Sequence, residues 1–214
     1  YGPSPGECID LLREKNVISV KGNHDHYVVS GNEHPDSFGI TESACKAVKW
    51  TREVLSREQI DWLDSLPFTL KRGDATFIHA AVDTAEGEYW PYIFDVHSAM
   101  FHFYFQETTF AFFGHIHVPL LFAHQCNDSA PPTIWVEKLK DRDFRELCDY
   151  KFLINPGSVG QPRNCDPRGS AIIFDMATKE IEIVAAEYDV KRTCEKIIAA
   201  GLPGDLAHRL GKGY

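Results

Sequence analysis

Gly114-His115-Ile116-His117 directly follows the apolar run from Thr109 to Phe113, and two earlier junctions in the chain have the same form. Gly22-Asn23-His24-Asp25 follows the run from Val17 to Val20, and His79 follows the run from Ala75 to Ile78. Short apolar runs bounded by turn residues are typical of buried strands. Ligands in open α/β folds bind beyond the carboxyl ends of the strands, so these junctions predict one shared site.

The remaining elements predict an α/β domain in which mixed sheets are covered by helices. Helical spacing predicts helices over Pro3–Glu14, on either side of Arg52–Leu55, over Phe94–Phe105 and from Asp189 to Ala200. The capping-box pattern Ser56-Arg57-Glu58-Gln59 marks a further helix start. The remaining strands are expected at 68–70, 133–137, 152–154, 170–176 and 180–187. Loops are expected over Lys21–Asp36 and Lys138–Asp149.

Composition narrows the class of protein. The 214 residues, 43% of them hydrophobic, are enough for one domain, which we expect to span residues 1–214. A formal net charge of -9 makes bulk nucleic acid an unfavourable partner. No apolar stretch approaches the ~20 residues that cross a bilayer. The six widely spaced cysteines favour free thiols and a cytoplasmic location.

The chemistry of the three junctions favours a catalytic metal. Neutral imidazoles and an amide oxygen suit Mn, Fe, Zn or Ni, and no cysteine stands in these segments to form a structural zinc site. A single histidine at a strand end is more often a core or surface residue, and Gly-Asn-His-Asp alone is compatible with a polar turn. The hypothesis of a metal site therefore depends on the three junctions together.

In this order the motifs resemble those of the calcineurin-like metallophosphoesterases, in their small single-domain prokaryotic branch. The family order is Asp-x-His, Gly-Asp, Gly-Asn-His-Asp, a lone His and Gly-His-x-His, and this chain matches the last three. Asn155-Pro156-Gly157-Ser158 resembles the loop of the branch after the next strand, and Tyr1-Gly2-Pro3 resembles the segment after Gly-Asp. Since the first two motifs are absent, we expect an N-terminally incomplete domain. The implied fold is a four-layer α/β/β/α sandwich with mixed sheets that lacks its first strand-helix-strand.

The resemblance also implies roles for particular residues. Asn23, His79 and His115 would ligate one of two divalent ions and His117 the other, while the carboxylate that bridges them would belong to the absent motifs. His24 would face the substrate, and Asp25 would orient His24. Metal-bound hydroxide would then attack the phosphorus atom of the substrate.

These roles imply a hydrolase acting on a phosphomonoester, a phosphodiester or a nucleotide-like substrate, with a nucleotide or a phosphoprotein as possible partners. Two alternatives stay open, a noncatalytic binding scaffold on the same fold and a truncated, inactive metal binder. The roles of Arg163 and of one aromatic cluster are also open at this point. Arg163 contacts phosphate or forms an exposed salt bridge, and the aromatic cluster of Tyr89, Trp90, Tyr92 and Phe94 lines a nucleotide base or belongs to the core.

Overall fold

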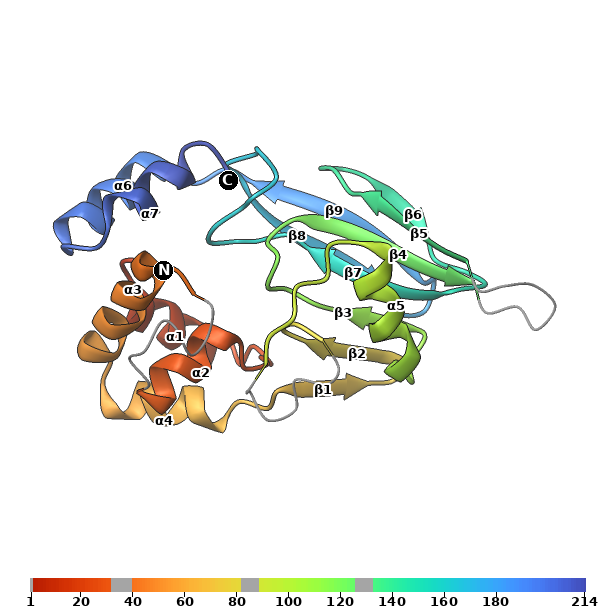
Figure 1. The fold of residues 1–214 in the computed structure, drawn as a ribbon, viewed down its shortest axis with the longest axis horizontal. Coiled ribbons are helices and arrows are strands. Elements are labelled where there is room, and N and C mark those ends of the chain that lie inside the picture. Colours follow the sequence, from red (N-terminus) through yellow and green to blue (C-terminus); the bar gives the residue numbers. More distant parts are fainter. Residues whose placement is uncertain (1, 32–39, 82–88, 126–132) are drawn as a thin grey trace.

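Three short parallel strands bring the predicted strand ends together. In the computed structural model, which describes residues 2–31, 40–81, 89–125 and 133–214, β2 (Ala75–Ile78) pairs with β3 (Phe110–Phe112), and β3 pairs with β7 (Lys151–Pro156). Because these strands are parallel, their carboxyl ends lie at one edge of the sheet (Figure 1). The segments that follow them begin the functional site.

The larger sheet is completed by antiparallel strands on both sides of this parallel core. Its order is β1-β2-β3-β7-β4-β5, with β1 at Thr69–Arg72, β4 at Pro119–Gln125 and β5 at Thr133–Lys138. The smaller, antiparallel sheet has the order β6-β9-β8. Its strands are β6 (Phe144–Glu146), β8 (Gly169–Asp175) and β9 (Glu180–Ala186).

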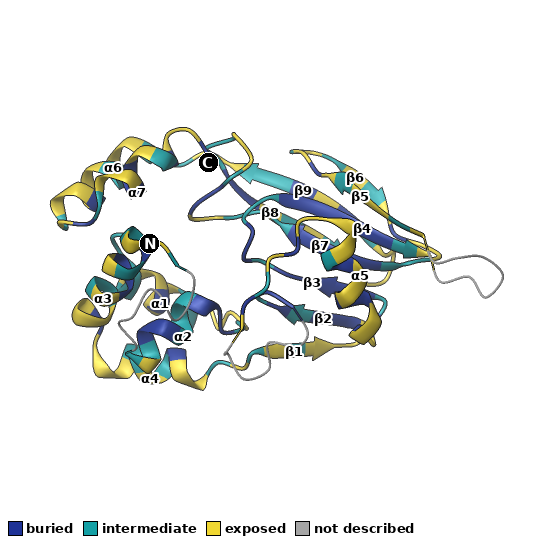
Figure 2. Cartoon of the chain, viewed as in Figure 1, coloured by how far each residue is buried: buried dark blue, intermediate teal, exposed yellow. Residues whose placement is uncertain are grey.

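Apolar side chains fill the space between the two sheets. Phe110, Phe152 and Ile154 of the larger sheet pack in one cluster with Ile181 and Ile183 of β9. Each of these five side chains is buried, and Figure 2 shows buried residues concentrated in the central strands of the larger sheet. Alternation of side chains along a strand places the remaining residues of these strands on the opposite faces.

Helix α5 (Val96–Phe105) covers the other face of the larger sheet. Asp95 caps its first turn by accepting a hydrogen bond from the Ser98 backbone amide at 2.8 Å. Ala99 and Phe103 of α5 pack against Phe113 and Phe122. The layers α5, larger sheet and smaller sheet therefore lie one on another.

The remaining helices form two further groups beside the sheets. The N-terminal group consists of α1 (Pro5–Glu14), α2 (Asn23–Ser30), α3 (Glu42–Val54) and α4 (Arg57–Ser65). The predicted capping box of α4 is present, because Ser56 and Gln59 exchange hydrogen bonds of 3.0 and 3.2 Å. The C-terminal group is α6 (Val190–Ala199) and α7 (Gly204–Leu210), which pack on each other and on Ala47 of α3. Asp189 caps α6 as predicted.

The predicted fold class, α/β with mixed sheets and helices, is confirmed, whereas three local predictions are wrong. Residues 17–20 are not a strand, because no described strand pairs with them, and Val17 and Ile18 are 46% and 53% exposed. The predicted loop from Lys21 contains α2, whose Tyr27 and Val28 are buried among the N-terminal helices. Its continuation over residues 32–36 lies outside the described residues. The predicted loop from Lys138 contains β6, which pairs with the distant β9.

Two further predictions concern membrane-spanning segments and disulfide bonds. None of the helices in the described ranges is both long enough and apolar enough to cross a membrane. The cysteines of these ranges form no disulfide; they are Cys8, Cys45, Cys148, Cys165 and Cys194.

Candidate metal and phosphate site

The imidazole of His79 meets the side chain of Asn23 at the centre of the site. His79 follows β2 directly, Asn23 is the first residue of α2, and His79 Nε2 lies 2.9 Å from Asn23 Oδ1. The amide oxygen only accepts, so the Nε2–H group donates in this arrangement. Two of the predicted metal ligands are therefore neighbours, although they are distant in sequence.

Glycines on both sides make room for the His79 ring. A Cβ atom at Gly22 would lie 3.0 to 3.2 Å from three atoms of this ring, and one at Gly114 would lie 3.4 Å from its Nδ1. Gly22 has φ -95°, a value open to any residue, so the need for glycine is steric at this position. The glycines of two separate motifs thus flank one imidazole.

The backbone at His115 and His117 is unusual. Both residues have left-handed conformations, with φ of 64° and 60°, while Ile116 between them is buried. Left-handed backbone costs a non-glycine residue about 1–2 kcal/mol, and such strain concentrates at functional sites. The turn is held in place because Gly114 N donates to His79 O at 2.9 Å and Ile116 N donates to Gly114 O at 2.7 Å.

Backbone carbonyls orient both of these imidazoles. His115 Nε2 donates to Trp90 O at 3.1 Å, and His117 Nδ1 donates to Gln161 O at 2.7 Å. In each neutral ring the other nitrogen keeps its lone pair, as for metal-ligating histidines whose outer partner fixes the tautomer. The ring of Tyr92 also stacks on His115, with centroids 4.1 Å apart.

Asn155, at the end of β7, connects the loops of the site. Its Nδ2 donates to Gly114 O at 2.5 Å, and its Oδ1 accepts from Gly157 N at 2.9 Å. Asn155 is fully buried, and Gly157 has φ 88° in a space that Ser170 and Pro119 leave too small for a Cβ. The segments after β3 and β7 are thus fixed to each other.

Burial keeps these imidazoles neutral. It lowers the pKa of His79 to about 3, and it lowers the pKa of both His115 and His117 to about 4. Removal from water disfavours the charged form of an imidazole. The three rings are therefore in the form that binds a metal ion at neutral pH.

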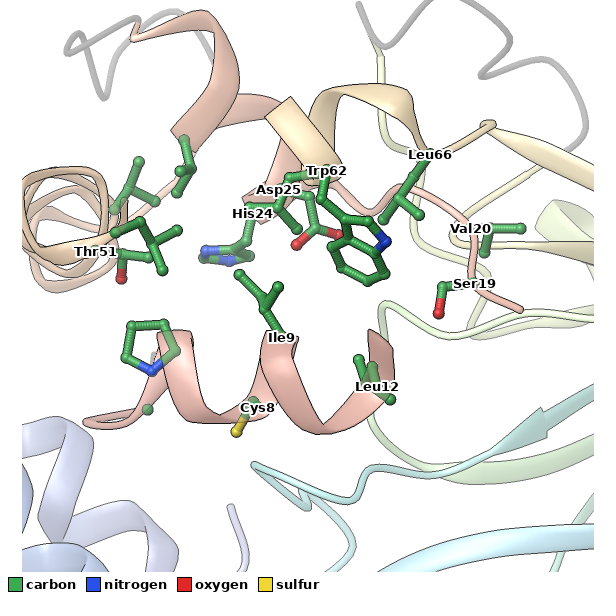
Figure 3. A pocket seen from close by; sticks show the side chains of 16 residues that line it. Cys8, Ile9, Leu12, Ser19, Val20, His24, Asp25, Thr51, Trp62 and Leu66 are labelled. Carbon is green, nitrogen blue, oxygen red and sulfur yellow. The ribbon is translucent and has the colours of Figure 1, made fainter. Parts of the chain in front are cut away.

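His24 and Asp25 lie beside a cavity of about 400 Å³ between α1 and the helices α2 to α4. Figure 3 shows both side chains directed into this space, opposite Ile9 and near Trp62. Burial lowers the pKa of His24 well below its ordinary value and raises the pKa of Asp25. The Asp25 carboxylate accepts a hydrogen bond from Gly22 N at 2.8 Å. Its predicted role in orienting His24 stays a prediction.

A smaller cavity of about 190 Å³ joins most of the predicted site residues. Its lining residues are Asn23, His24, Ile40, Thr41, Tyr92, His115, His117, Arg163 and Arg209. Its volume lies below the ~300–1,000 Å³ that is usual for pockets enclosing a drug-sized ligand. The cavity therefore suits the phosphate-bearing end of a molecule better than a whole nucleotide.

The donors gathered here match a divalent ion in chemistry. Two ligands of one ion at ~2.1 Å and at right angles lie roughly 3 Å apart, close to the spacing of Asn23 Oδ1 and His79 Nε2. In the present arrangement, however, the described residues contain no group of three or more His, Cys, Asp or Glu side chains that could hold an ion. None of the described residues that line the cavity carries a carboxylate. The ligand roles of Asn23, His79, His115 and His117 remain predictions.

The sequence analysis included Asn155 in the loop that resembles the one in the family, but it did not predict that Asn155 connects the loops of the site. The signal available in the sequence was a polar residue after the apolar run Phe152–Ile154. Two further residues were not predicted. Thr41 and Arg209 come from distant helical regions and gave no local signal. Of the aromatic cluster, Trp90 belongs to the core of the N-terminal helices, Tyr92 lines the cavity, and Tyr89 is 68% exposed.

Several known proteins are similar to this chain over its whole length. An uncharacterised protein of Methanocaldococcus jannaschii, MJ0912, is 37% identical over 219 residues, which cover 100% of this chain and 82% of the relative. A metallophosphoesterase from Sphaerobacter thermophilus has a crystal structure that aligns with a TM-score of 0.83 at 33% identity, covering 100% of this chain and 84% of that one. The hypothetical protein PH1004 of Pyrococcus horikoshii OT3 shares the fold, with a TM-score of 0.73 at 19% identity over 100% of this chain and 81% of that one.

The family comparison covers most of the sequence. The calcineurin-like phosphoesterase superfamily domain matches residues 3–179, a range that includes all three histidine-bearing junctions and the loop after β7. Proteins of this family generally use divalent metals. The chain therefore belongs to the calcineurin-like phosphoesterase superfamily, whose members are metal-dependent phosphoesterases in general.

Proposed function

We propose that this protein hydrolyses a small phosphomonoester or phosphodiester, or a nucleotide-like substrate, with a divalent metal ion. One observation carries the proposal: the segment that follows β3 and the start of α2 place Asn23, His115 and His117 around one small cavity. Burying polar imidazoles costs free energy, so the gathering of several at one cavity favours a functional role over a purely structural one.

The chain's own residues would divide the work as follows. Asn23, His79 and His115 would hold one divalent ion, and His117 would face a second. When bound, such ions activate water and neutralise charge that develops on the phosphoryl group. His24, which also lines the cavity, would assist the leaving group by donating a hydrogen bond from its neutral ring. Trp90 O and Gln161 O would hold the ligand rings in position.

The cavity size supports a substrate that enters only in part. The phosphoryl group would sit among the histidines, and the rest of the molecule would contact the rim, where Ile40, Thr41 and Tyr92 lie. A nucleotide or a phosphoprotein side chain would both meet this requirement. Contacts with Ile40, Thr41 and Tyr92 would decide which of these two substrates binds better.

The direct test is hydrolysis of bis(p-nitrophenyl) phosphate and p-nitrophenyl phosphate by the full chain in the presence of Mn²⁺. We expect turnover by the wild type and its loss in the variant in which His79→Ala and His115→Ala are combined. His97→Ala is a matched control, because His97 is exposed on α5, away from the cavity. An unchanged rate in the double variant would refute the proposed function.

The absence of a carboxylate among the described residues of the cavity favours a second candidate, a metal-binding scaffold without catalysis. Catalysis with two metal ions requires both ions to act on the same phosphoryl group. The resemblance implies a carboxylate that holds the two ions together, and imidazoles and an amide do not supply it. Metal stoichiometry separates the candidates. Two ions per chain agree with the enzyme, whereas one or none, together with absent turnover, agrees with the scaffold.

A further inference from the structure

Two arginines reach the small cavity from different parts of the chain. Arg163 follows β7 and Arg209 belongs to α7, and both line the cavity that His24, His115 and His117 also line. Within the part of the chain that the structure describes, no Asp or Glu lines this cavity. Apart from the histidines, its charged lining side chains are these two guanidinium groups.

Arg163 is fixed in place by an uncharged group. Its backbone amide donates to His117 O at 3.0 Å, and its Nε and Nη2 atoms donate to Gln161 Oε1 at 3.3 and 2.9 Å. Gln161 is buried and also accepts the His117 ring hydrogen bond through its backbone carbonyl. Arg163 is therefore tied to the orientation of His117, while its positive charge is not neutralised by this partner.

Arg168, the next arginine along the chain, differs from Arg163 because carboxylates neutralise its charge. Arg168 forms ion pairs of 2.7 Å with both Asp141 and Asp166. Among the described residues, no ion pair with a carboxylate involves Arg163. In a chain of net charge -9, a guanidinium left without a carboxylate at a cavity wall indicates a site for an anion from outside.

Arg209 is positioned by packing far from the histidine motifs. Leu206, Ala207 and Leu210 of α7 are buried in one cluster with Ala47 of α3, and Arg209 Nε donates to Tyr214 O at 2.7 Å. Arg209 also lines the cavity together with His117 and Arg163. The C-terminal helices thus deliver a second cation to the same wall.

We propose that Arg163 and Arg209 bind a second phosphate group of the substrate, next to the phosphoryl group that is cleaved. This inference rests on the proposed function and narrows it to compounds with two neighbouring phosphate groups, such as organic diphosphates. In the proposed function, the histidines and the metal ion that they would hold contact the phosphoryl group that is cleaved. Two guanidinium groups supply both the positive charge and the N–H donors that bind a phosphate group. The small cavity requires the two groups to be close together.

The test compares the binding of inorganic pyrophosphate and orthophosphate to the purified full chain by isothermal titration calorimetry at constant ionic strength. We expect pyrophosphate to bind the wild type at least about tenfold more tightly than orthophosphate, as a charge-assisted pair would provide. Arg163→Gln and Arg209→Gln should each remove most of this preference. Arg163→Lys should restore part of it, because the charge returns without the planar fork.

Arg72→Gln is the matched control, since Arg72 is exposed at the end of β1 and does not line the cavity. It removes one positive charge, and we expect it to leave both affinities unchanged. Equal affinities for the two anions in the wild type would overturn the inference. So would a preference for pyrophosphate that survives both cavity variants.

A parallel assay keeps this inference separate from the proposed function. If wild-type protein with Mn²⁺ hydrolyses p-nitrophenyl phosphate but shows no arginine-dependent pyrophosphate preference, the proposed function stands and this inference fails. If it hydrolyses no ester yet binds pyrophosphate through both arginines, the proposed function fails and the anion site is retained.

Discussion

Asn23 Oδ1 and His79 Nε2 lie 2.9 Å apart, although the two residues are 56 positions apart in the sequence. The contact joins the first turn of α2 to the end of β2, and it sets the spacing expected of two ligands on one ion. Several measurable consequences follow from this contact and from the groups that surround it.

The first prediction concerns metal affinity. Asn23→Ala removes a predicted ligand oxygen, and Asn23→Asp keeps it. Outer partners of metal ligands are worth about 10- to 100-fold in affinity, and a direct ligand should be worth at least as much. We therefore expect Mn²⁺ binding, measured by calorimetry, to weaken at least tenfold in Asn23→Ala and to survive in Asn23→Asp. Equal affinity in the wild type and Asn23→Ala would remove Asn23 from the ligand set.

The second prediction concerns the glycine beside His79. A methyl group at Gly22 would stand 3.0 Å from His79 Nδ1, so Gly22→Ala forces the ring to move. Overpacking of this kind costs about 1–3 kcal/mol, and a misplaced catalytic group loses up to about 100-fold in rate. We expect lower stability in urea and at least tenfold slower hydrolysis of p-nitrophenyl phosphate. Gly160→Ala is the control, because a Cβ there meets nothing within 4 Å.

The third prediction concerns Asn155. Asn155→Ala leaves Gly114 O and Gly157 N without their present partner in a buried region. An unsatisfied buried polar group costs about 1–3 kcal/mol, so the free energy of unfolding should fall by about 2 kcal/mol or more. Asn164→Ala, at an exposed position in the next loop, should change it by less than about 0.5 kcal/mol. Equal urea midpoints for the two variants would contradict the connecting role of Asn155.

The fourth prediction concerns His102 of α5, which is fully buried and has no hydrogen-bond partner for either ring nitrogen among the described residues. Burial lowers its pKa to about 4, whereas an unfolded histidine has a pKa of about 6.5. Between these values the unfolded chain binds more protons, so this residue's contribution to stability is lost as the pH falls. The full loss below pH 4 is about 3 kcal/mol.

The variant His102→Leu should therefore lose less stability than the wild type between pH 7.5 and pH 5. Urea unfolding at both values measures the difference. His97→Gln, at an exposed position of the same helix, should follow the wild type. If His102→Leu also follows the wild type, the buried imidazole is not the source of the pH dependence.

The sequence predicted the strand ends beside the candidate site, because local chemistry determines them. His79 and Gly114 stand at the ends of short apolar runs, and those runs became β2 and β3 because their side chains fill the core. The start of α6 was likewise predictable, since Asp189 caps it through a local hydrogen bond. The fold class followed from the order of such elements.

The sequence failed where long-range packing decides the structure. Asn23-His24-Asp25-His26 is polar and favours a turn, but Tyr27 and Val28 are buried against other helices and make the segment helical. Arg209 enters the cavity because α7 packs on α3, a contact that no local pattern reveals. Residues 144–146 are a strand only through pairing with β9.

The connection through Asn155 has a consequence for protein engineering. Gly114 N is bonded to His79 O, Gly114 O to Asn155 Nδ2, and Asn155 Oδ1 to Gly157 N, so three loops share one continuous chain of hydrogen bonds. Transplanting a single loop from a relative would break this chain at its junctions. Chimeras designed to change specificity should therefore exchange the three loops as one unit, or vary only lining residues outside these loops, such as Ile40 and Thr41.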